Sequence, residues 1–144
     1  YISTVAVWNS GILLTRLLDK LNEATNQSIF KDKSIIELGC GVGLASLATA
    51  KLGASSVLAT DANIEVLELA QRNIQQNNLT DIIKTTALQW GLMDATEYES
   101  TADIVIGSDL TYNSGSWVVL AETMSTIIKS NGIVIYLTLG QSED

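Results

Sequence analysis

The chain has 144 residues, a length typical of one domain, and 47 % of them are apolar, which is enough to build a core. Its formal charge of −8, with the 8 Lys and Arg scattered along the chain, disfavours a nucleic-acid partner, because phosphate binding needs clustered positive charge. There is no His and a single Cys, so the composition excludes His-assisted nucleophilic catalysis, His- or Cys-rich zinc sites and any internal disulfide.

Helical and strand patterns alternate along the chain. Apolar residues at helical spacing predict helices, and short apolar runs bounded by turn residues predict buried strands. The predicted elements are a helix over 10–24, a strand over 34–38, a helix over 42–52, a strand over 57–60, a helix over 64–76 with Asn63 as its N-cap, strands over 82–88 and 104–107, a helix over 116–130 and a strand over 133–139. This alternation predicts a single α/β domain over 1–144, with a mostly parallel sheet and helices on both faces.

Four candidate site positions follow the first four predicted strands. They are the glycines from Gly39 onward, Asp61, Trp90 and Asp109. Ligands of such sheets bind outside the carboxyl ends of the strands, so we expect these positions to meet at one edge.

The stretch "IIELGCGVGL" at 35–44 is a strand that enters a glycine-rich turn and then a helix. Glycines allow a tight turn and a close approach of the backbone to a ligand, and Asp61 after the next strand can accept hydrogen bonds from ribose hydroxyls. Together they predict a cofactor that contains adenosine. A dinucleotide is disfavoured, because the sixth position of G-x-G-x-x-G is Leu44 and because Glu37 fits an amino or cationic group better than a pyrophosphate.

"ELGCGVGL" with Asp61 resembles the glycine motif and acidic ribose contact of the seven-strand, class I methyltransferases, which are Rossmann-like and use S-adenosylmethionine. Three further stretches, "VWNSGILLTRLL", "LQWG" and "DIVIGSDLTYN", resemble the non-histone protein lysine methyltransferase branch. The resemblance covers nearly the whole chain. It implies a protein substrate that presents a lysine, such as a translation factor or chaperone. It also implies cofactor contacts at Trp8, Glu37, Gly39, Cys40, Gly41, Asp61, Trp90 and Ser108, and catalytic roles for Asp109 and Tyr112.

The nucleophile in such a transfer is a neutral amine, whereas free lysine has a pKa of about 10.4. A carboxylate alone would raise the pKa of that amine, so we assign Asp109 to capture and orientation of the ammonium group. Tyr112 would line the channel or accept a hydrogen bond.

Several alternatives stay open. The chain could be a class I methyltransferase for a small molecule or a protein histidine, a non-catalytic cofactor-binding domain, or a nicotinamide-dependent dehydrogenase. Enzymes that methylate the amino groups of nucleic-acid bases resemble it less, because they carry Asn/Asp-Pro-Pro-Tyr where this proline-free chain has "SDLTY". For single residues, Trp8 could simply cover a helix, and Trp90 and Tyr112 could be packing residues.

The related fold has seven strands, whereas five are predicted, so we expect the final hairpin to be missing and the domain to be incomplete at its C-terminus. The acidic surface suits a basic partner. No metal site, membrane span or secretory leader is expected, and a monomer located in the cytoplasm is predicted.

Overall fold

The computed structural model describes residues 7–111 and 113–139, except for the side chain of Leu92. Within these residues, five strands form one parallel sheet in the order β3-β2-β1-β4-β5. The strands are β1 Ser34–Leu38, β2 Ser56–Asp61, β3 Ile83–Ala87, β4 Ala102–Ser108 and β5 Ile128–Leu137. The order runs outward from β1 in both directions, so the chain changes direction across the sheet between β3 and β4.

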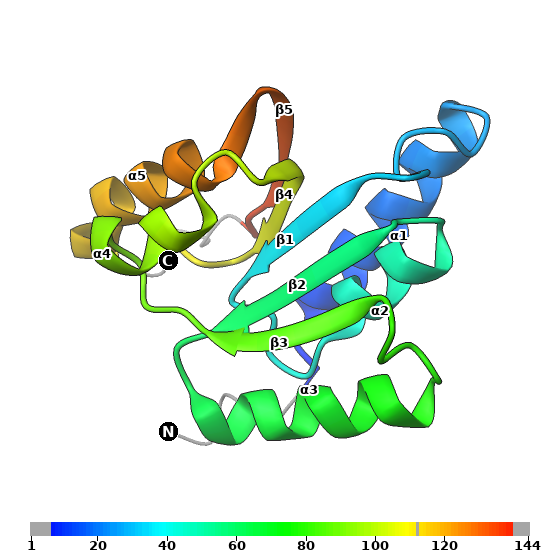
Figure 1. Cartoon of the computed structure of the whole chain (residues 1–144), viewed down its shortest axis with the longest axis horizontal. Coiled ribbons are helices and arrows are strands. Elements are labelled where there is room, and N and C mark those ends of the chain that lie inside the picture. Colours follow the sequence, from blue (N-terminus) through cyan, green and yellow to red (C-terminus); the bar gives the residue numbers. More distant parts are fainter. Residues whose placement is uncertain (1–6, 112, 140–144) are drawn as a thin grey trace.

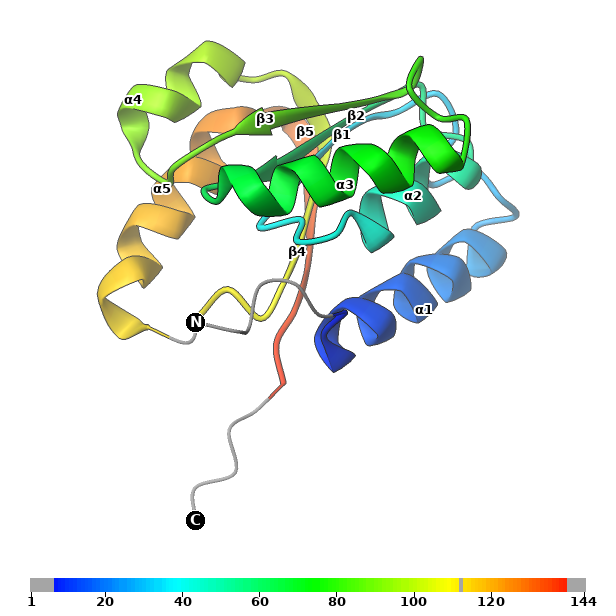
Figure 2. The same ribbon diagram turned by 90° about the horizontal axis from the view of Figure 1, so that it is seen from below.

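The helices cover both faces of this sheet. They are α1 Asn9–Ala24, α2 Leu44–Lys51, α3 Ile64–Gln76, α4 Leu92–Ala95 and α5 Trp117–Ile127, with short 3-10 turns η1 Thr96–Tyr98 and η2 Ser114–Ser116. Helices α1, α2 and α3 lie together on one side of the sheet, and α4 and α5 lie beyond its other side (Figure 2). The predicted N-cap is confirmed, because the Asn63 side chain accepts a hydrogen bond of 2.9 Å from the backbone N–H of Glu65 at the start of α3.

Alternating strand residues divide the core into two clusters. Ile35 points to the cluster formed with α1, α2 and α3, whereas its neighbour Ile36 belongs to the cluster formed with α4 and α5. Continuous apolar runs such as that of β1 are therefore buried on both faces, as expected for a parallel sheet with helices on both sides. The predicted α/β fold is confirmed.

One predicted boundary is wrong. The helix predicted over 116–130 ends at Ile127, and β5 begins at once with Ile128, which has extended backbone angles and pairs with Ala102 of β4. The ammonium group of Lys129 lies 2.8 Å from a carboxylate oxygen of Asp103. These long-range contacts override the helical spacing of the apolar residues. The four-residue helix α4 was not predicted, because it is too short to show a periodicity.

Because all the strand pairs are parallel, the carboxyl ends of the strands lie at one edge of the sheet. The arrowheads of β1, β2 and β3 point to the same end of the sheet, and α3 starts there (Figure 1). Because each crossover helix runs antiparallel to its strands, the N-termini of the helices gather at the carboxyl edge of the sheet. In the described part of the chain, no helix has the length and apolar character needed to cross a membrane.

Candidate active site

A cavity of about 730 Å³ lies at the carboxyl edge of the sheet. This volume is typical of sites for cofactors and other small molecules. Its lining includes nearly all of the residues that the sequence singled out, namely Trp8, Glu37, Gly39, Cys40, Gly41, Asp61, Trp90, Ser108 and Asp109. The remaining one, Tyr112, lies outside the described residues. The structure brings these side chains together, and their individual roles stay predictions.

The glycine loop after β1 has a backbone conformation that requires glycine. Gly39, Gly41 and Gly43 all have positive φ angles, of 64°, 54° and 86°. A Cβ atom on Gly39 would lie 2.5 Å from Cδ2 of Leu110, whereas a Cβ atom on Gly41 would meet no atom within 4 Å. Gly39 is therefore needed for packing, and Gly41 leaves open space at the cavity.

Asp61 at the end of β2 fixes the loop and still faces the cavity. Its Oδ2 accepts a hydrogen bond of 3.1 Å from the Gly41 N–H, and its Oδ1 accepts one of 3.0 Å from the Asn63 N–H. A carboxylate has about four acceptor positions, so this partly exposed group retains capacity for two more donors. This is the capacity needed to bind a pair of ribose hydroxyls.

Glu37 is a carboxyl group in an unusual setting. It lies on β1, is only 4 % exposed, and accepts a hydrogen bond from the hydroxyl of Ser46 on α2. Burial raises its pKa from 4.5 to about 7, and the negative charge of Asp61 adds to this increase, while the bond from Ser46 acts against it. A cationic ligand in the cavity would supply a positive charge that stabilises the ionised form of Glu37.

Cys40 contributes its backbone rather than its thiol. Its N–H donates a hydrogen bond of 2.8 Å to the carbonyl of Thr60, which ties the glycine loop to β2. Burial raises the pKa of the Cys40 thiol, and the nearby Glu37 charge raises it further. A thiol in this state is a poor nucleophile.

Asp109 follows β4 and is held firmly by its neighbours. It has a positive φ of 52°, and its N–H donates a hydrogen bond of 2.8 Å to the carbonyl of Leu137. The next residue, Leu110, donates its N–H to the Tyr136 hydroxyl at 2.8 Å and covers Gly39 with its side chain. Five other non-glycine residues of the described chain also have a positive φ, and Asp adopts this conformation more readily than most residues, so the hydrogen bonds rather than the φ angle distinguish this segment.

Two tryptophans flank the cavity from different elements. Trp90, after β3, is half-buried against the core cluster of α4 and α5 and also lines the cavity. Trp8, just before α1, is 55 % exposed. Trp90 therefore packs on the core and lines the cavity at the same time, whereas Trp8 lines the cavity and is exposed to solvent.

Sequence reasoning missed several residues that support the site. They are Ser46, which holds Glu37; Leu110 and Tyr136, which hold the segment after β4; and Gln89, which lines the cavity beside Trp90. Gln89 and Leu110 had a usable signal, since they stand in the "LQWG" and "DIVIGSDLTYN" stretches that follow predicted strands.

The charge of the cavity has one sign. Glu37, Asp61 and Asp109 line it, and no Lys or Arg does so among the described residues. Within 7–111 and 113–139, no group of three or more His, Cys, Asp or Glu side chains is arranged to hold a metal ion. The site therefore suits a ligand with positive charge, and its described lining lacks the cations that would neutralise a pyrophosphate.

Related proteins were found by sequence. The chain is 34 % identical over 105 residues to a calmodulin-lysine N-methyltransferase of Arabidopsis thaliana, with 70 % of this chain and 34 % of that protein covered. It is 32 % identical over 130 residues to the protein-lysine N-methyltransferase EFM3 of Chaetomium thermophilum, with 84 % of this chain and 37 % of that protein covered. A ribosomal protein L11 methyltransferase of Haemophilus influenzae is 34 % identical over 102 residues, with 71 % and 32 % covered. The chain thus spans about a third of the length of the curated relatives it matches.

Solved structures share the fold at lower identity. A candidate S-adenosyl-L-methionine-dependent methyltransferase of Methanococcus maripaludis superposes with a TM-score of 0.70 at 20 % identity, over 86 % of this chain and 62 % of that one. A precorrin 8W decarboxylase of Methanobacterium thermoautotrophicum has the same TM-score and identity, over 92 % and 65 %. The family model described as lysine methyltransferase matches residues 3–144. The resemblance seen in the sequence is confirmed: this chain belongs to the lysine methyltransferase family.

Proposed function

We propose that this chain forms the cofactor-binding and catalytic part of an S-adenosylmethionine-dependent protein-lysine N-methyltransferase that acts on a non-histone protein, such as a translation factor or chaperone. The observation that carries the proposal is the cavity itself. It combines a glycine loop, the carboxylate of Asp61 after β2 and the carboxylate of Asp109 after β4, with no cation in its described lining.

The family implies S-adenosylmethionine as cofactor, and the residues fit this molecule. Gly41 leaves open space beside the cavity, Asp61 has free acceptor positions for ribose hydroxyls, and Glu37 offers a buried carboxyl group to an amino group. Backbone groups of Gly39 and Cys40, the side chain of Ser108 and the rings of Trp8 and Trp90 complete the predicted contacts. When bound, S-adenosylmethionine supplies an activated methyl group on a sulfonium centre.

The protein's own part in the reaction is mainly to position the nucleophile. Asp109 would bind the lysine ammonium group and orient it at the cavity. Its backbone is fixed by Leu137 of β5, so the carboxylate is presented from a rigid loop. The aromatic walls would remove water from the amine, which lowers its pKa and opposes the effect of Asp109. The proton would pass to water, and Tyr112 would line the channel.

A protein substrate is supported by the names of the relatives, which act on calmodulin, on ribosomal protein L11 and on protein lysines. An acidic chain with an acidic cavity is also a poor match for nucleic acid. Action on a small molecule or on a protein histidine is the alternative. A monomer and a location in the cytoplasm remain predictions from the sequence.

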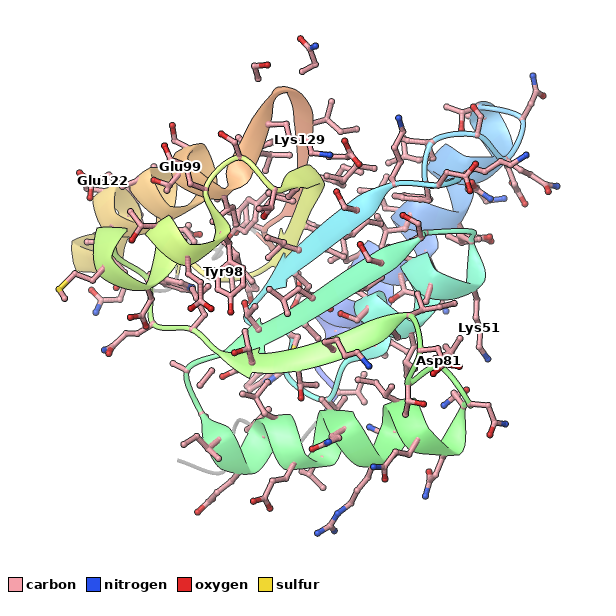
Figure 3. All side chains as sticks on the ribbon, in the orientation of Figure 1. Lys51, Asp81, Tyr98, Glu99, Glu122 and Lys129 are labelled. Carbon is pink, nitrogen blue, oxygen red and sulfur yellow. The ribbon has the colours of Figure 1, made fainter. Side chains whose placement is uncertain are left out.

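Calorimetric titration tests the cofactor. S-adenosylmethionine should bind and NAD should not, and Asp61→Ala should abolish the binding, because it removes both the ribose acceptor and the anchor of Gly41. Asp81→Ala is the matched control, since this exposed aspartate lies near the opposite end of the sheet (Figure 3). Binding of NAD alone, or equal binding by the Asp61 variant, would refute the cofactor assignment.

Methyl transfer tests the acceptor. Radiolabelled cofactor should label proteins in an extract, and blocking of lysines by reductive alkylation should remove the label. Label that persists after lysine blocking would point to histidine, and label found only in small molecules would exclude a protein substrate.

A further inference from the structure

Large apolar side chains that are exposed to solvent gather around the mouth of the cavity. We call this set the apolar rim, and its members are Val7, Trp8, Ile64, Met93, Trp117 and Val118. Each belongs to a segment that lies at the carboxyl edge of the sheet: the start of α1, α3 or α5, or the short helix α4 that follows β3. Met93 is 92 %, Val118 68 % and Ile64 65 % exposed. Single exposed apolar residues need no explanation, but such a group around a site marks an interaction surface.

The first turn of α5 links this rim directly to the cavity. Ser116 and Val119 line the cavity, while Trp117 and Val118 between them face solvent. The Trp117 indole is nevertheless held in place, because its N–H donates a hydrogen bond of 2.9 Å to the carbonyl of Thr111. Thr111 lies only two positions after Asp109. An exposed aromatic side chain that is already ordered loses little entropy when a partner covers it, which is typical of interface anchors.

Acidic residues lie beside the rim. Every charged residue between Lys84 and Lys129 is acidic; these are Asp94, Glu97, Glu99, Asp103, Asp109 and Glu122, of which Asp103 lies at the far end of β4 and is paired with Lys129. Glu122 stands four positions after Val118 on the outer side of α5, so the two side chains are neighbours. Glu65 is next to Ile64 and is also exposed. Figure 3 shows Glu99 and Glu122 on the α5 side of the molecule, whereas Lys51 and Asp81 lie on the side away from it.

From this arrangement we infer that the apolar rim docks an extended, basic segment of the protein substrate. One apolar side chain of that segment packs on Trp117 and Val118, and Lys or Arg residues on either side of the target lysine face Glu122 and Glu65 beside the rim. The inference rests on the proposed function and adds to it the chemistry of the sequence that surrounds the modified lysine.

Charge disfavours the other obvious occupants. An anionic membrane surface would be repelled by a chain with a net charge of −8, and so would a second copy of the same chain. A basic peptide gains both from the apolar contact and from electrostatic attraction, which raises the rate of association and depends on salt.

Peptide binding tests the inference. Three synthetic peptides share one central lysine: one has alternating arginine and leucine on both sides, one has serine in place of leucine, and one has glutamate in place of arginine. Their affinities are measured by fluorescence anisotropy, with S-adenosylhomocysteine present, at low and at high salt. The arginine–leucine peptide should bind at least about tenfold more tightly than the other two, and its affinity should fall with salt.

Paired variants locate the surface. Val118→Ala and Trp117→Ala should weaken binding of that peptide, by about fivefold and by more than about tenfold. Val134→Ala, a matched change at a valine of β5 that is 44 % exposed, should leave it unchanged. Glu122→Gln should reduce the dependence on salt, and Asp81→Asn should not.

Each other result has a defined meaning. Equal affinity for the three peptides, or equal effects of Val118→Ala and Val134→Ala, would overturn the inference. So would binding to phosphatidylserine vesicles, or a dimer in sedimentation, that Val118→Ala abolishes. Calorimetry with S-adenosylmethionine on the same samples separates the two proposals, because Trp117 and Val118 do not line the cavity. Cofactor binding without discrimination between peptides refutes only the docking surface; discrimination between peptides without cofactor binding refutes only the proposed function.

Discussion

Replacement of Glu37 by Gln should change how the stability of the protein depends on pH. The carboxyl group of Glu37 is buried on β1, and burial raises its pKa from 4.5 to about 7. The unfolded chain therefore loses this proton near pH 4.5, while the folded protein keeps it until about pH 7. Between these values the folded state binds more protons than the unfolded state, so the free energy of unfolding falls as pH rises.

The size of the effect follows from the width of this interval. The interval between the two pKa values corresponds to a contribution of about 3 kcal/mol to the free energy of unfolding. This contribution is fully present below the unfolded pKa and is lost above the folded pKa. Gln keeps a carbonyl that can accept the hydrogen bond from Ser46, but it cannot ionise. The variant should therefore lack this part of the pH dependence and should exceed the original protein in stability at about pH 8, by up to about 3 kcal/mol.

Urea unfolding at several pH values measures the effect. Glu68→Gln is the matched control, because Glu68 is an exposed residue of α3. Saturating S-adenosylmethionine should reduce the loss of stability, since a cationic ligand favours the charged form of Glu37. If the original protein and the Glu37 variant lose stability in parallel as pH rises, the buried carboxyl group is not the cause and this reasoning fails.

Five further substitutions, at four positions, have expected outcomes. Gly39→Ala should destabilise the fold by about 3 kcal/mol in urea unfolding, because its Cβ meets Leu110, whereas Gly41→Ala should cost about 1 kcal/mol but weaken cofactor binding in calorimetry. Asp109→Ala should abolish methyl transfer, and Asp109→Asn should lower it at least about 100-fold, with cofactor binding intact in both; near-full activity would refute the role in capture. Asp103→Ala should cost about 1–3 kcal/mol in thermal unfolding, because it removes the acceptor for the Ser34 N–H at 2.9 Å and the partner of Lys129. The hydrogen bond with Lys129 holds the pKa of Asp103 below its usual range, so this contribution is present above the unfolded pKa and is lost as pH falls through the folded one; a loss of stability that is equal at all pH values would contradict it.

The elements that the sequence predicted well are those specified by local patterns. The strand over 34–38 and the helix over 64–76 match β1 and α3, because a continuous apolar run and an N-cap asparagine act within a few residues. The boundary between α5 and β5 was not predictable in this way. Ile127 and Ile128 look alike in sequence, and the helix ends where long-range contacts begin, with the pairing of Ile128 and Ala102 and the contact of Lys129 with Asp103.

The candidate site was predictable where topology alone determines position. Parallel strands bring their carboxyl ends to one edge, so Gly39, Asp61, Trp90 and Asp109 could be grouped before their contacts were known. The residues that hold them were not predictable. Ser46 meets Glu37 across an interface between helix and strand, and Tyr136 reaches Leu110 from β5. No periodicity records such contacts, because they depend on how the elements pack in space.

The distribution of charge shows why both kinds of information are needed. The absence of basic residues between Lys84 and Lys129 is visible in the sequence, where it is consistent with a merely soluble surface. The fold shows where part of this acidic segment lies, because α5 and the segment after β4 are beside the cavity that contains Glu37 and Asp61. Under the proposed function, the cofactor and the lysine substrate are both cations that enter an acidic site, and they repel one another there. Such a site must hold each with its own carboxylates, and the separation of Glu37 and Asp61 on the glycine-loop side from Asp109 on the β4 side meets this requirement.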